Sequence, residues 1–272
     1  MSSTRTPGQS PDTASPLRRR LVRSFGSGRG RITRAQERAY REVFPRYAVP
    51  YQAQAIDPEA CFGRKAPLVL EIGFGMGETT AAIAAVKPQL DFLAVEVFAA
   101  GIGALAMHLA RLELTNVRIV QHDAVEVVRD MLSPGALAAV HIFFPDPWPK
   151  ARHHKRRLIT PAFISSLAQR LAPSGIIHCA TDWQHYAEHM LDVLSHEPSL
   201  SNLHRGFAPA LNNPLCDRPA TKFHARGQRL GHPVWDLVFQ RTPTPTPLPE
   251  AEGPNTPAAR PSGRGVGGEG RN

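Results

Sequence analysis

The chain has 272 residues, of which 42% are apolar, enough for one globular domain with attachments or for two small domains. No window of about 18 residues is apolar and uncharged, and the N-terminus lacks an apolar signal core, so we expect neither a membrane helix nor a secretory signal. The cysteines Cys61, Cys179 and Cys216 are far apart and odd in number, which argues against a disulfide framework and favours the reducing cytoplasm.

Positive charge is concentrated near the N-terminus. Residues 1–48 contain 11 arginines against three acidic residues, a net charge of +8. Residues 49–241 contain 18 Lys and Arg against 17 Asp and Glu, a net charge of +1. A basic arm of this kind is typical of a segment that contacts nucleic-acid phosphates, but it is also typical of a solubilising tail, and composition leaves both open.

The two ends of the chain have compositions that do not build a core. Residues 1–30 are rich in Ser, Thr, Pro, Gly and Arg, and the tail from Thr242 onward is rich in Pro and Gly, so we expect both to be disordered. Residues 31–44 have the composition of a helix. The predicted divisions are a basic arm over 1–48, a single domain over 49–241 and a tail over 242–272.

Between these ends, short apolar runs alternate with longer helical stretches. The runs are apolar throughout, which is typical of parallel strands covered on both faces. Repeated units of this kind predict an α/β fold with a doubly wound, Rossmann-like sheet. The predicted strands are Leu68–Ile72, Phe92–Val95, Val117–Val120, Val140–Phe144 and Ile176–Ala180, with an added edge strand at 234–241. The predicted helices are 78–86, 99–113, 124–132, 160–172 and 183–197.

A glycine-rich turn follows the first predicted strand directly, in LVLEIGFGMGETT. Gly73, Gly75 and Gly77 let the backbone turn tightly and let a ligand approach the main chain, while the amides of the next helix face that ligand. The spacing GxGxG differs from the GxGxxG of dinucleotide sites. Glu71 precedes the first glycine, where a carboxylate repels a pyrophosphate but accepts a hydrogen bond from an ammonium group.

Acidic residues end successive predicted strands. Glu96 ends the second strand, where an acid fits ribose hydroxyls, and Asp123 follows the third strand within reach of an adenine edge. Ligands of such sheets bind at the carboxyl edge of the strands. A ribose, an adenine, an ammonium and a sulfonium together describe S-adenosylmethionine, which is the cofactor we predict. NAD is the rival ligand, and helix capping is the alternative role for each acid.

The stretch HIFFPDPWPKARHHKRR ends an apolar run at Asp146, which stands between two prolines. Pro145 and Pro147 restrict φ on either side of it, so a rigidly held carboxylate is predicted beside the methyl donor. Trp148 is predicted either to stack on a base or to join the core. The cations that follow are predicted to hold phosphates, although such a run is also typical of a solvated surface. They are Lys150, Arg152, Lys155, Arg156 and Arg157.

Several other side chains have structural predictions. For Asp182, one open alternative is that it caps the helix that starts near Trp183, a role that is compatible with a substrate contact. His153 and His154 are adjacent, but no Cys or carboxylate pattern accompanies them, so no metal site is predicted. Five large side chains are predicted to belong to the core: Trp183, Trp235, Met107, Met131 and Met190.

The stretch FFPDPWPKARHHKRRL resembles the signature of the bacterial tRNA (guanine-N7-)-methyltransferases. TDWQHYAEHM at 181–190 and RPATKFHARGQRLGHPVWDLVFQR at 218–241 resemble two further motifs of that family, and the similarity covers about residues 66–241. The resemblance implies a class I methyltransferase with a seven-stranded, mostly parallel sheet. It implies methyl transfer from S-adenosylmethionine to N7 of a guanosine in the variable loop of tRNA. Composition favours a cytoplasmic protein with no membrane partner, and the sequence leaves open whether it is a monomer or a homodimer.

The resemblance also implies roles for single residues. The cofactor acids are Glu71, Glu96, Asp123 and Asp146, and Asp146 is also the active-site residue. The substrate-contacting residues are Lys150, Asp182, Thr221, Lys222, Phe223 and His224. The RNA-interacting residues are Arg152, His153, His154, Lys155, Arg156 and Arg157. One departure matters, because the family's TKFE reads TKFH here, so His224 stands where a carboxylate is expected.

The chemistry of the acceptor agrees with this site. Guanine N7 carries a lone pair and no proton, so methyl transfer to it needs positioning rather than an obligatory base. Two alternatives stay open at this point. One is a methyltransferase of the same fold that acts on a protein or a small molecule, and the other is a non-catalytic RNA-binding subunit. The intact glycines and acids argue against the second.

Overall fold

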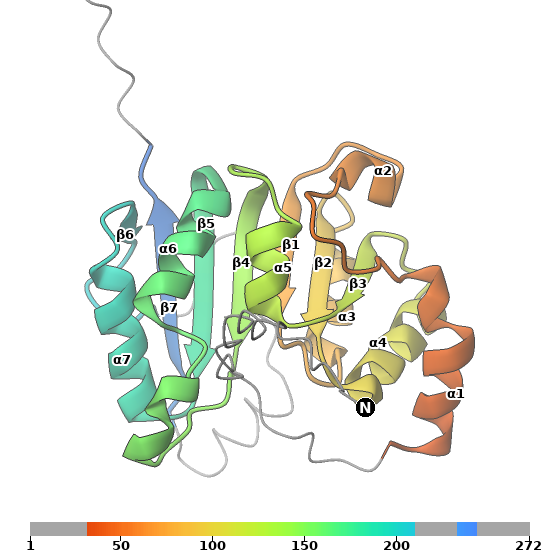
Figure 1. Cartoon of the computed structure of the whole chain (residues 1–272), viewed down its shortest axis with the longest axis horizontal. Helices are drawn as coiled ribbons and strands as arrows, with labels where there is room; N and C mark the ends of the chain where they lie inside the picture. The colour runs from red at the N-terminus through yellow and green to blue at the C-terminus, as the bar shows by residue number, and fades with distance from the viewer. Residues whose placement is uncertain (1–31, 210–232, 244–272) are drawn as a thin grey trace, which may run out of the picture. The chain divides into compact units, whose positions relative to one another are not determined.

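The computed structural model describes residues 32–209 and 233–243 (Figure 1). The chain divides into two units, Met1–Thr242 and Pro243–Asn272, and the fold below is that of the first unit. The predictions for residues 1–30 and for almost all of the tail therefore lie outside the described residues.

Seven strands form a single sheet in the order β3-β2-β1-β4-β5-β7-β6. Strands β1 to β5 pair in parallel, whereas β7 is antiparallel to both β5 and β6. This confirms the prediction of a doubly wound, mostly parallel α/β sheet. The strands are β1 (Leu68–Ile72), β2 (Asp91–Glu96), β3 (Val117–Gln121), β4 (Leu137–Phe143), β5 (Leu171–Thr181), β6 (Leu200–Asn202) and β7 (Trp235–Arg241).

The sheet differs from the prediction at its antiparallel end. The predicted edge position of β7 is wrong, because β6 pairs with its outer side and is itself the last strand in the order. Strand β6 has three residues, of which only Leu200 is buried. So short a strand with one buried residue carries no apolar run or alternation, and for this reason the sequence pattern did not indicate it.

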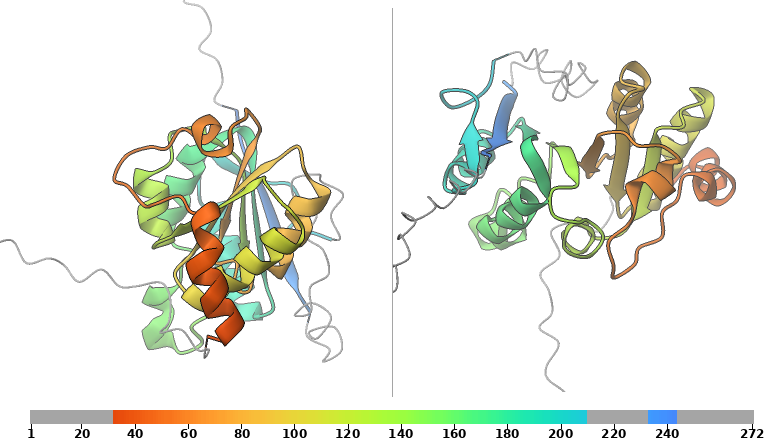
Figure 2. Two further views of the ribbon diagram at one scale, coloured as in Figure 1. Left: turned by 90° about the vertical axis from the view of Figure 1, so that its right-hand side faces the viewer. Right: turned by 90° about the horizontal axis from the view of Figure 1, so that it is seen from above.

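Helices cover both faces of the sheet (Figure 2). Apolar side chains of α3 and α4 pack on one face, and those of α5, α6 and α7 pack on the other. None of the helices in the described part of the chain is long and apolar enough to cross a membrane. The helices are α1 (Arg34–Glu42), α2 (Pro58–Phe62), α3 (Glu78–Val86), α4 (Ala99–Arg111), α5 (Ala124–Asp130), α6 (Pro161–Arg170) and α7 (Gln184–Ser195), with 3-10 helices η1 (Phe44–Arg46) and η2 (Ala151–Arg156).

The segment before β1 is built onto the sheet. Helix α1 starts with a capping box, in which the Thr33 hydroxyl accepts from the Gln36 amide and the Gln36 side chain accepts from the Thr33 amide. Farther on, the chain runs beside β3, where the Ile119 amide donates to Tyr47 and the Val49 amide donates to Ile119. The C-terminal part of the predicted basic arm is thereby packed against the domain.

The core predictions for large side chains were right in part. Met131 and Met190 are fully buried, which confirms their predicted place. Met107 and Trp183 are 42% and 44% exposed, so their prediction as core residues is wrong. Met107 lies on an outward face of α4, and Trp183 is the N-cap residue of α7, which places it in the loop after β5. Trp235 is half-buried at the start of β7.

Candidate active site

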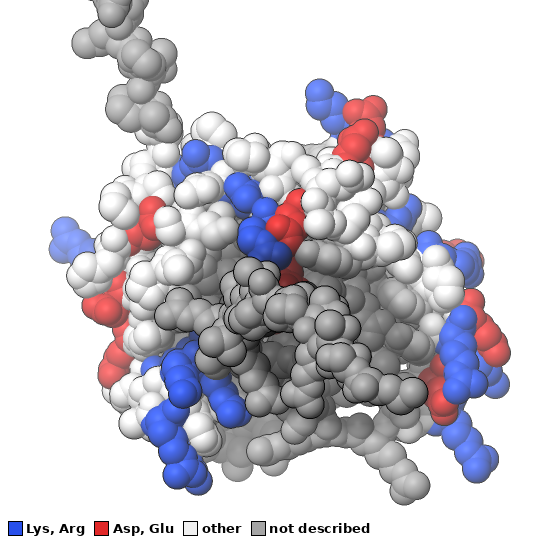
Figure 3. Space-filling view, viewed as in Figure 1, with Lys and Arg blue, Asp and Glu red and all other residues white. Residues whose placement is uncertain are grey.

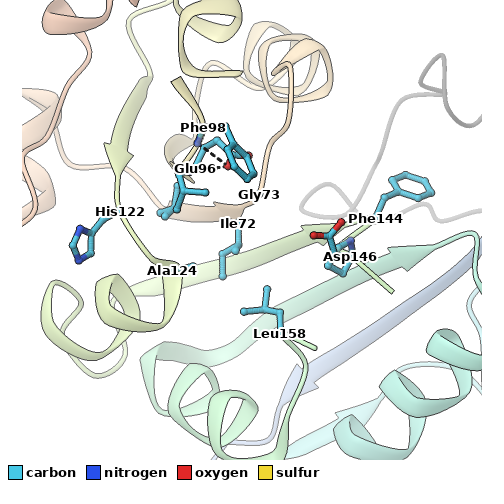
Figure 4. A pocket seen from close by; sticks show the side chains of 12 residues that line it. Ile72, Gly73, Glu96, Phe98, His122, Ala124, Phe144, Asp146 and Leu158 are labelled. Atoms are coloured by element: carbon cyan, nitrogen blue, oxygen red, sulfur yellow. Dashed lines mark hydrogen bonds between the residues drawn. The ribbon is translucent and has the colours of Figure 1, made fainter. Parts of the chain in front are cut away.

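A pocket lies where β1, β2, β3 and β4 end at the carboxyl edge of the sheet (Figure 4). Such an edge is the place where open α/β sheets bind ligands, because strand order reverses there and leaves a crevice. In Figure 4, His122 lies at one end of the pocket and Asp146 at the other. The lining residues are Ile72, Gly73, Val95, Glu96, Val97, Phe98, His122, Ala124, Phe144, Pro145, Asp146 and Leu158.

The glycine turn is open toward this pocket. Within the described part of the chain, a Cβ atom added at Gly73 or Gly75 would meet nothing within 4 Å, so a ligand has room against the main chain. All three glycines have a positive φ, of 74°, 58° and 73°. Gly77 is required for a further reason, because an added Cβ would lie 2.6 Å from the Cβ of Leu105. The turn therefore combines an open cradle with tight support from α4.

Gly101 of α4 supports the same turn, and the sequence pattern did not single it out. An added Cβ at Gly101 would clash with the carbonyl oxygen of Gly75. The glycine lets the helix and the turn approach each other closely. The only sequence signal was a second glycine-containing stretch, AAGIGALA, at the start of a helix.

Glu96 is buried at the end of β2 and is held by main-chain amides. Its carboxylate accepts from the amides of Val97 at 2.7 Å, Phe98 at 3.3 Å and Gly75 at 3.2 Å. Burial raises the pKa of Glu96, the three amides oppose that shift, and the nearby negative charge of Asp146 adds to it. Glu96 and Asp146 are thus close enough for their charges to interact.

Glu71 occupies a different environment from the other acids. Its side chain is 2% exposed and lies near the hydroxyl of Thr80 in α3, and its Oε2 has no hydrogen-bond partner among the residues that the structure describes. Burial raises the pKa of Glu71 to about 7, with Thr80 opposing the shift. A buried carboxyl oxygen without a partner fits a cationic ligand group that completes its hydrogen bonding.

Asp123 caps α5, since its carboxylate accepts from the Val125 amide at 2.9 Å. The neighbours of Asp123, His122 and Ala124, line the pocket. The imidazole of His122 stacks on the ring of Tyr51 with centroids 3.6 Å apart. The Tyr51 hydroxyl donates to Asp130 at 2.6 Å. Tyr51, which precedes the sheet in the chain, therefore links His122 at the end of β3 to Asp130 in α5.

The loop around Asp146 is conformationally strained on both sides. Phe144 and Trp148 have positive φ values of 50° and 45°, a region that bulky residues rarely adopt. The Phe144 amide donates to the carbonyl of Ala180 at 2.7 Å, which ties the loop to β5. The Asp146 side chain is exposed at the pocket wall. Both prolines and this strain present the carboxylate in one place.

Arg157 supports that loop from inside. Its side chain is 3% exposed, its Nε donates to the carbonyl of Pro147 at 3.0 Å, and its guanidinium lies 4.8 Å from the centre of the Tyr186 ring. The Nη2 atom of Arg157 lies 3.1 Å from Nδ1 of His185. Residue type and position predicted a phosphate-binding cation here, but the structure places Arg157 beneath the Asp146 loop.

The remaining cations of this stretch are on the surface. In Figure 3 they form a blue cluster over η2, at the lower left of the view. Trp148 is half-buried there, with the Arg156 guanidinium 5.0 Å from its ring centre and the His153 ring 5.8 Å away. Desolvation, followed by the charge of Arg152, lowers the pKa of His153. The exposed cations of the cluster are Lys150, Arg152, Lys155 and Arg156.

The other predicted substrate residues divide into two groups. Asp182 is exposed at the end of β5, and Trp183 rather than Asp182 is the N-cap residue of α7, so the alternative capping role is wrong. Thr221, Lys222, Phe223 and His224 lie outside the described residues. His154 is half-buried with its ring 5.3 Å from that of His185.

These features together define a methyltransferase of the Rossmann-like class I fold. The sheet has the strand order of this class, the glycine turn after β1 is open, and two acids line the pocket, Glu96 at the end of β2 and Asp146 in the loop after β4. The crystal structure of the 16S rRNA methyltransferase KamB has the same fold, with a TM-score of 0.50, 14% identity, and coverage of 72% of this chain and 99% of that one.

Sequence comparison specifies the family. Residues 65–237 match the profile of a family described as "Putative methyltransferase". The tRNA (guanine-N(7)-)-methyltransferase of Burkholderia mallei is 55% identical over 230 residues, which cover 85% of this chain and 86% of that protein. The enzyme of the same name from Bordetella pertussis is 56% identical over 220 residues, covering 81% and 85%. The chain belongs to the tRNA (guanine-N(7)-)-methyltransferase family.

Proposed function

We propose that the protein transfers the methyl group of S-adenosylmethionine to N7 of a guanosine in tRNA, forming 7-methylguanosine. The observation that carries this proposal is the Asp146 carboxylate, presented by a strained loop at the wall of the cofactor pocket and bordered by an exposed basic cluster. The family's name gives the acceptor, and the resemblance of the motifs specifies the variable loop. A cytoplasmic location follows from tRNA as substrate.

The residues present fit this cofactor. We infer that the amides around Gly73 and Gly75 receive its amino-acid portion, with the partnerless oxygen of Glu71 completing the hydrogen bonding of the ammonium. Glu96, already held by amides, is oriented to accept hydrogen bonds from ribose hydroxyls. Asp123 and the apolar side chain of Ala124 then contact the adenine. When bound, the sulfonium supplies an electrophilic methyl group.

Asp146 then orients the acceptor. A carboxylate accepts hydrogen bonds from guanine N–H groups, and it stabilises the positive charge that the purine gains as N7 is methylated. Because N7 bears no proton, the main requirement is to hold it about 3–3.5 Å from the methyl carbon and in line with the leaving group. A loop with two prolines and two strained residues is suited to such a fixed placement.

The exposed cations have a separate role. We infer that Lys150, Arg152, Lys155 and Arg156 hold phosphates of the tRNA, and that Trp148, stacked against Arg156, limits how far the cluster can move. Asp182 lies at the end of the neighbouring strand, where it is available to the acceptor. Thr221 to His224 complete the substrate contacts that the motifs imply.

The test is incubation of the protein with S-adenosylmethionine carrying a labelled methyl group and unmodified tRNA, followed by nucleoside analysis. The expected product is labelled 7-methylguanosine, and the Asp146→Ala variant should form none while still binding tRNA and S-adenosylhomocysteine. Label in a protein or a small molecule instead of RNA would contradict the proposal. Binding of tRNA without methylation would point to a non-catalytic RNA-binding subunit.

A further inference from the structure

A row of polar side chains crosses the buried part of the sheet, on the face toward α3. Glu71 of β1 pairs in register with His141 of β4, which pairs with His178 of β5. Their exposed fractions are 2%, 2% and 0%. Burying polar groups in place of apolar ones is unfavourable unless they are hydrogen-bonded, so this row needs an explanation beyond packing.

His178 is the most completely buried member of the row, and it is paired. Its Nε2 lies 2.8 Å from the Oδ1 of Asp236 on β7, whose side chain is 19% exposed. The other ring nitrogen, Nδ1, has no hydrogen-bond partner in residues 32–209 and 233–243. The pair therefore joins β5 to β7 by side chains, in addition to the main-chain ladder between these two strands.

Three segments that lead to the acceptor side converge on this pair. The ring of Phe143, on β4 shortly before Asp146, meets the His178 ring edge-on at 5.0 Å. Strand β5 continues from His178 to Thr181, and Asp182 follows directly. On β7, the carbonyl of Asp236 accepts from the Ala208 amide at 2.7 Å.

The hydrogen bond between Ala208 and Asp236 joins two residues that are far apart in the sequence. Residues 210–232, which contain Thr221 to His224, stand between Ala208 and β7. The rings of Phe207 and Trp235 also lie 6.4 Å apart, so the two flanks of that segment are joined beside Asp236. The pair, in which His178 is buried and Asp236 is half-buried, thus underlies the two strands that lead to Asp146 and Asp182.

We propose that His178 and Asp236 are positioning residues for the acceptor guanosine, setting the relative placement of Asp146 and Asp182. This inference rests on the proposed function. The cofactor cradle is built mainly on β1, β2 and β3, which β4 separates from the pair in the strand order, so cofactor binding should not depend on it. We therefore expect a substitution in this pair to lower kcat/KM for tRNA and to leave the affinity for S-adenosylhomocysteine unchanged.

The test compares His178→Phe with His178→Gln in the full-length protein. Phenylalanine fills the space without a donor to Asp236, and we expect kcat/KM for tRNA to fall at least ~10-fold while the Kd for S-adenosylhomocysteine stays within ~2-fold. Glutamine keeps an N–H donor and should restore most of the activity. Gln240→Ala is the matched control, because it lies on β7 and bonds to Ser174 at the other end of the same junction.

The outcomes are distinct from those of the proposed function. If the parent protein, without substitutions, forms no 7-methylguanosine, the proposed function is wrong. If it does, and His178→Phe keeps its kcat/KM while only its melting temperature falls, the pair is merely structural and the inference is overturned. If His178→Phe does not bind S-adenosylhomocysteine, Asp236→Leu decides between the same two results, since leucine has a shape close to that of aspartate and no acceptor for His178.

Discussion

The buried guanidinium of Arg157 donates from its Nε to the carbonyl oxygen of Pro147 at 3.0 Å, directly beneath the loop that presents Asp146. Arg157 comes last in a run of exposed cations, yet it is 3% exposed. One short basic stretch therefore supplies both a support for the Asp146 loop and an exposed basic surface, which we propose holds phosphates. Substituting Arg157 and substituting the exposed cations before it should therefore have opposite effects on catalysis and on tRNA binding.

Replacing Arg157 with lysine should impair catalysis rather than RNA binding. A single ammonium cannot reach both Pro147 and His185, and a hydrogen bond from a charged group is worth about 1.5–3 kcal/mol. We expect the single-turnover rate at saturating tRNA to fall about 10-fold or more, with tRNA affinity within ~2-fold. If instead the affinity falls and its salt dependence weakens, Arg157 is a phosphate contact.

Replacing Arg152, Lys155 and Arg156 together with glutamine should have the reverse effect. Fewer cations on the phosphates release fewer counterions, so the slope of log K against log salt should become shallower by roughly 2–3. The turnover rate at saturating tRNA should change little. Salt titrations of tRNA binding give the measurement, with Lys65→Gln, an exposed cation before β1, as the control that leaves the slope unchanged.

Glu71 should make stability depend on pH. Its pKa is about 7 in the folded protein against an ordinary value of 4.5, so the folded state keeps a proton that the unfolded chain releases. Stability from this group is complete below pH about 4.5, falls as pH rises to about 7, and is constant above. The Glu71→Gln variant lacks this titration. Its free energy of unfolding, relative to that of the parent, should therefore rise by at most about 3 kcal/mol as pH increases across that window.

Urea unfolding of the parent and of Glu71→Gln at several pH values between about 5 and 8 measures this difference directly. Comparing the two proteins cancels the titration of histidines that both contain. Glu59→Gln, an exposed acid in α2, is the control and should track the parent. A constant difference across the range would show that Glu71 does not titrate there.

Gly101→Ala should weaken cofactor binding although the residue does not line the pocket. The new Cβ would push on the Gly75 carbonyl and displace the glycine turn, so we expect the Kd for S-adenosylhomocysteine to rise ~10-fold or more. Gly103→Ala is the matched control, since its Cβ would clash with the carbonyl of Gln36 in α1 instead. It should lower the melting temperature with a smaller effect on binding, as calorimetry will measure.

The predictions that held concern patterns that are local in sequence. Strand β1 and helix α3 have the predicted bounds, because an apolar run followed by glycines and a helix-forming stretch carries its own signal. The acids Glu71 and Glu96 lie near the ends of β1 and β2 as expected, and parallel strands bring their carboxyl ends to one edge. Motifs around Asp146 indicated the family by themselves.

The predictions that failed concern burial and neighbours. Residue type placed Trp183 inside and Arg157 outside, and the structure reverses both. Strand β6 and the inner position of β7 depend on pairing between segments far apart in the chain. Local patterns were enough to predict the strand–helix alternation, the glycine turn and the acids at the sheet edge, because these follow from nearest neighbours along the chain. Which cation supports the loop, and which histidine meets Asp236, became known from the fold alone, because burial and hydrogen bonding depend on groups contributed by distant strands.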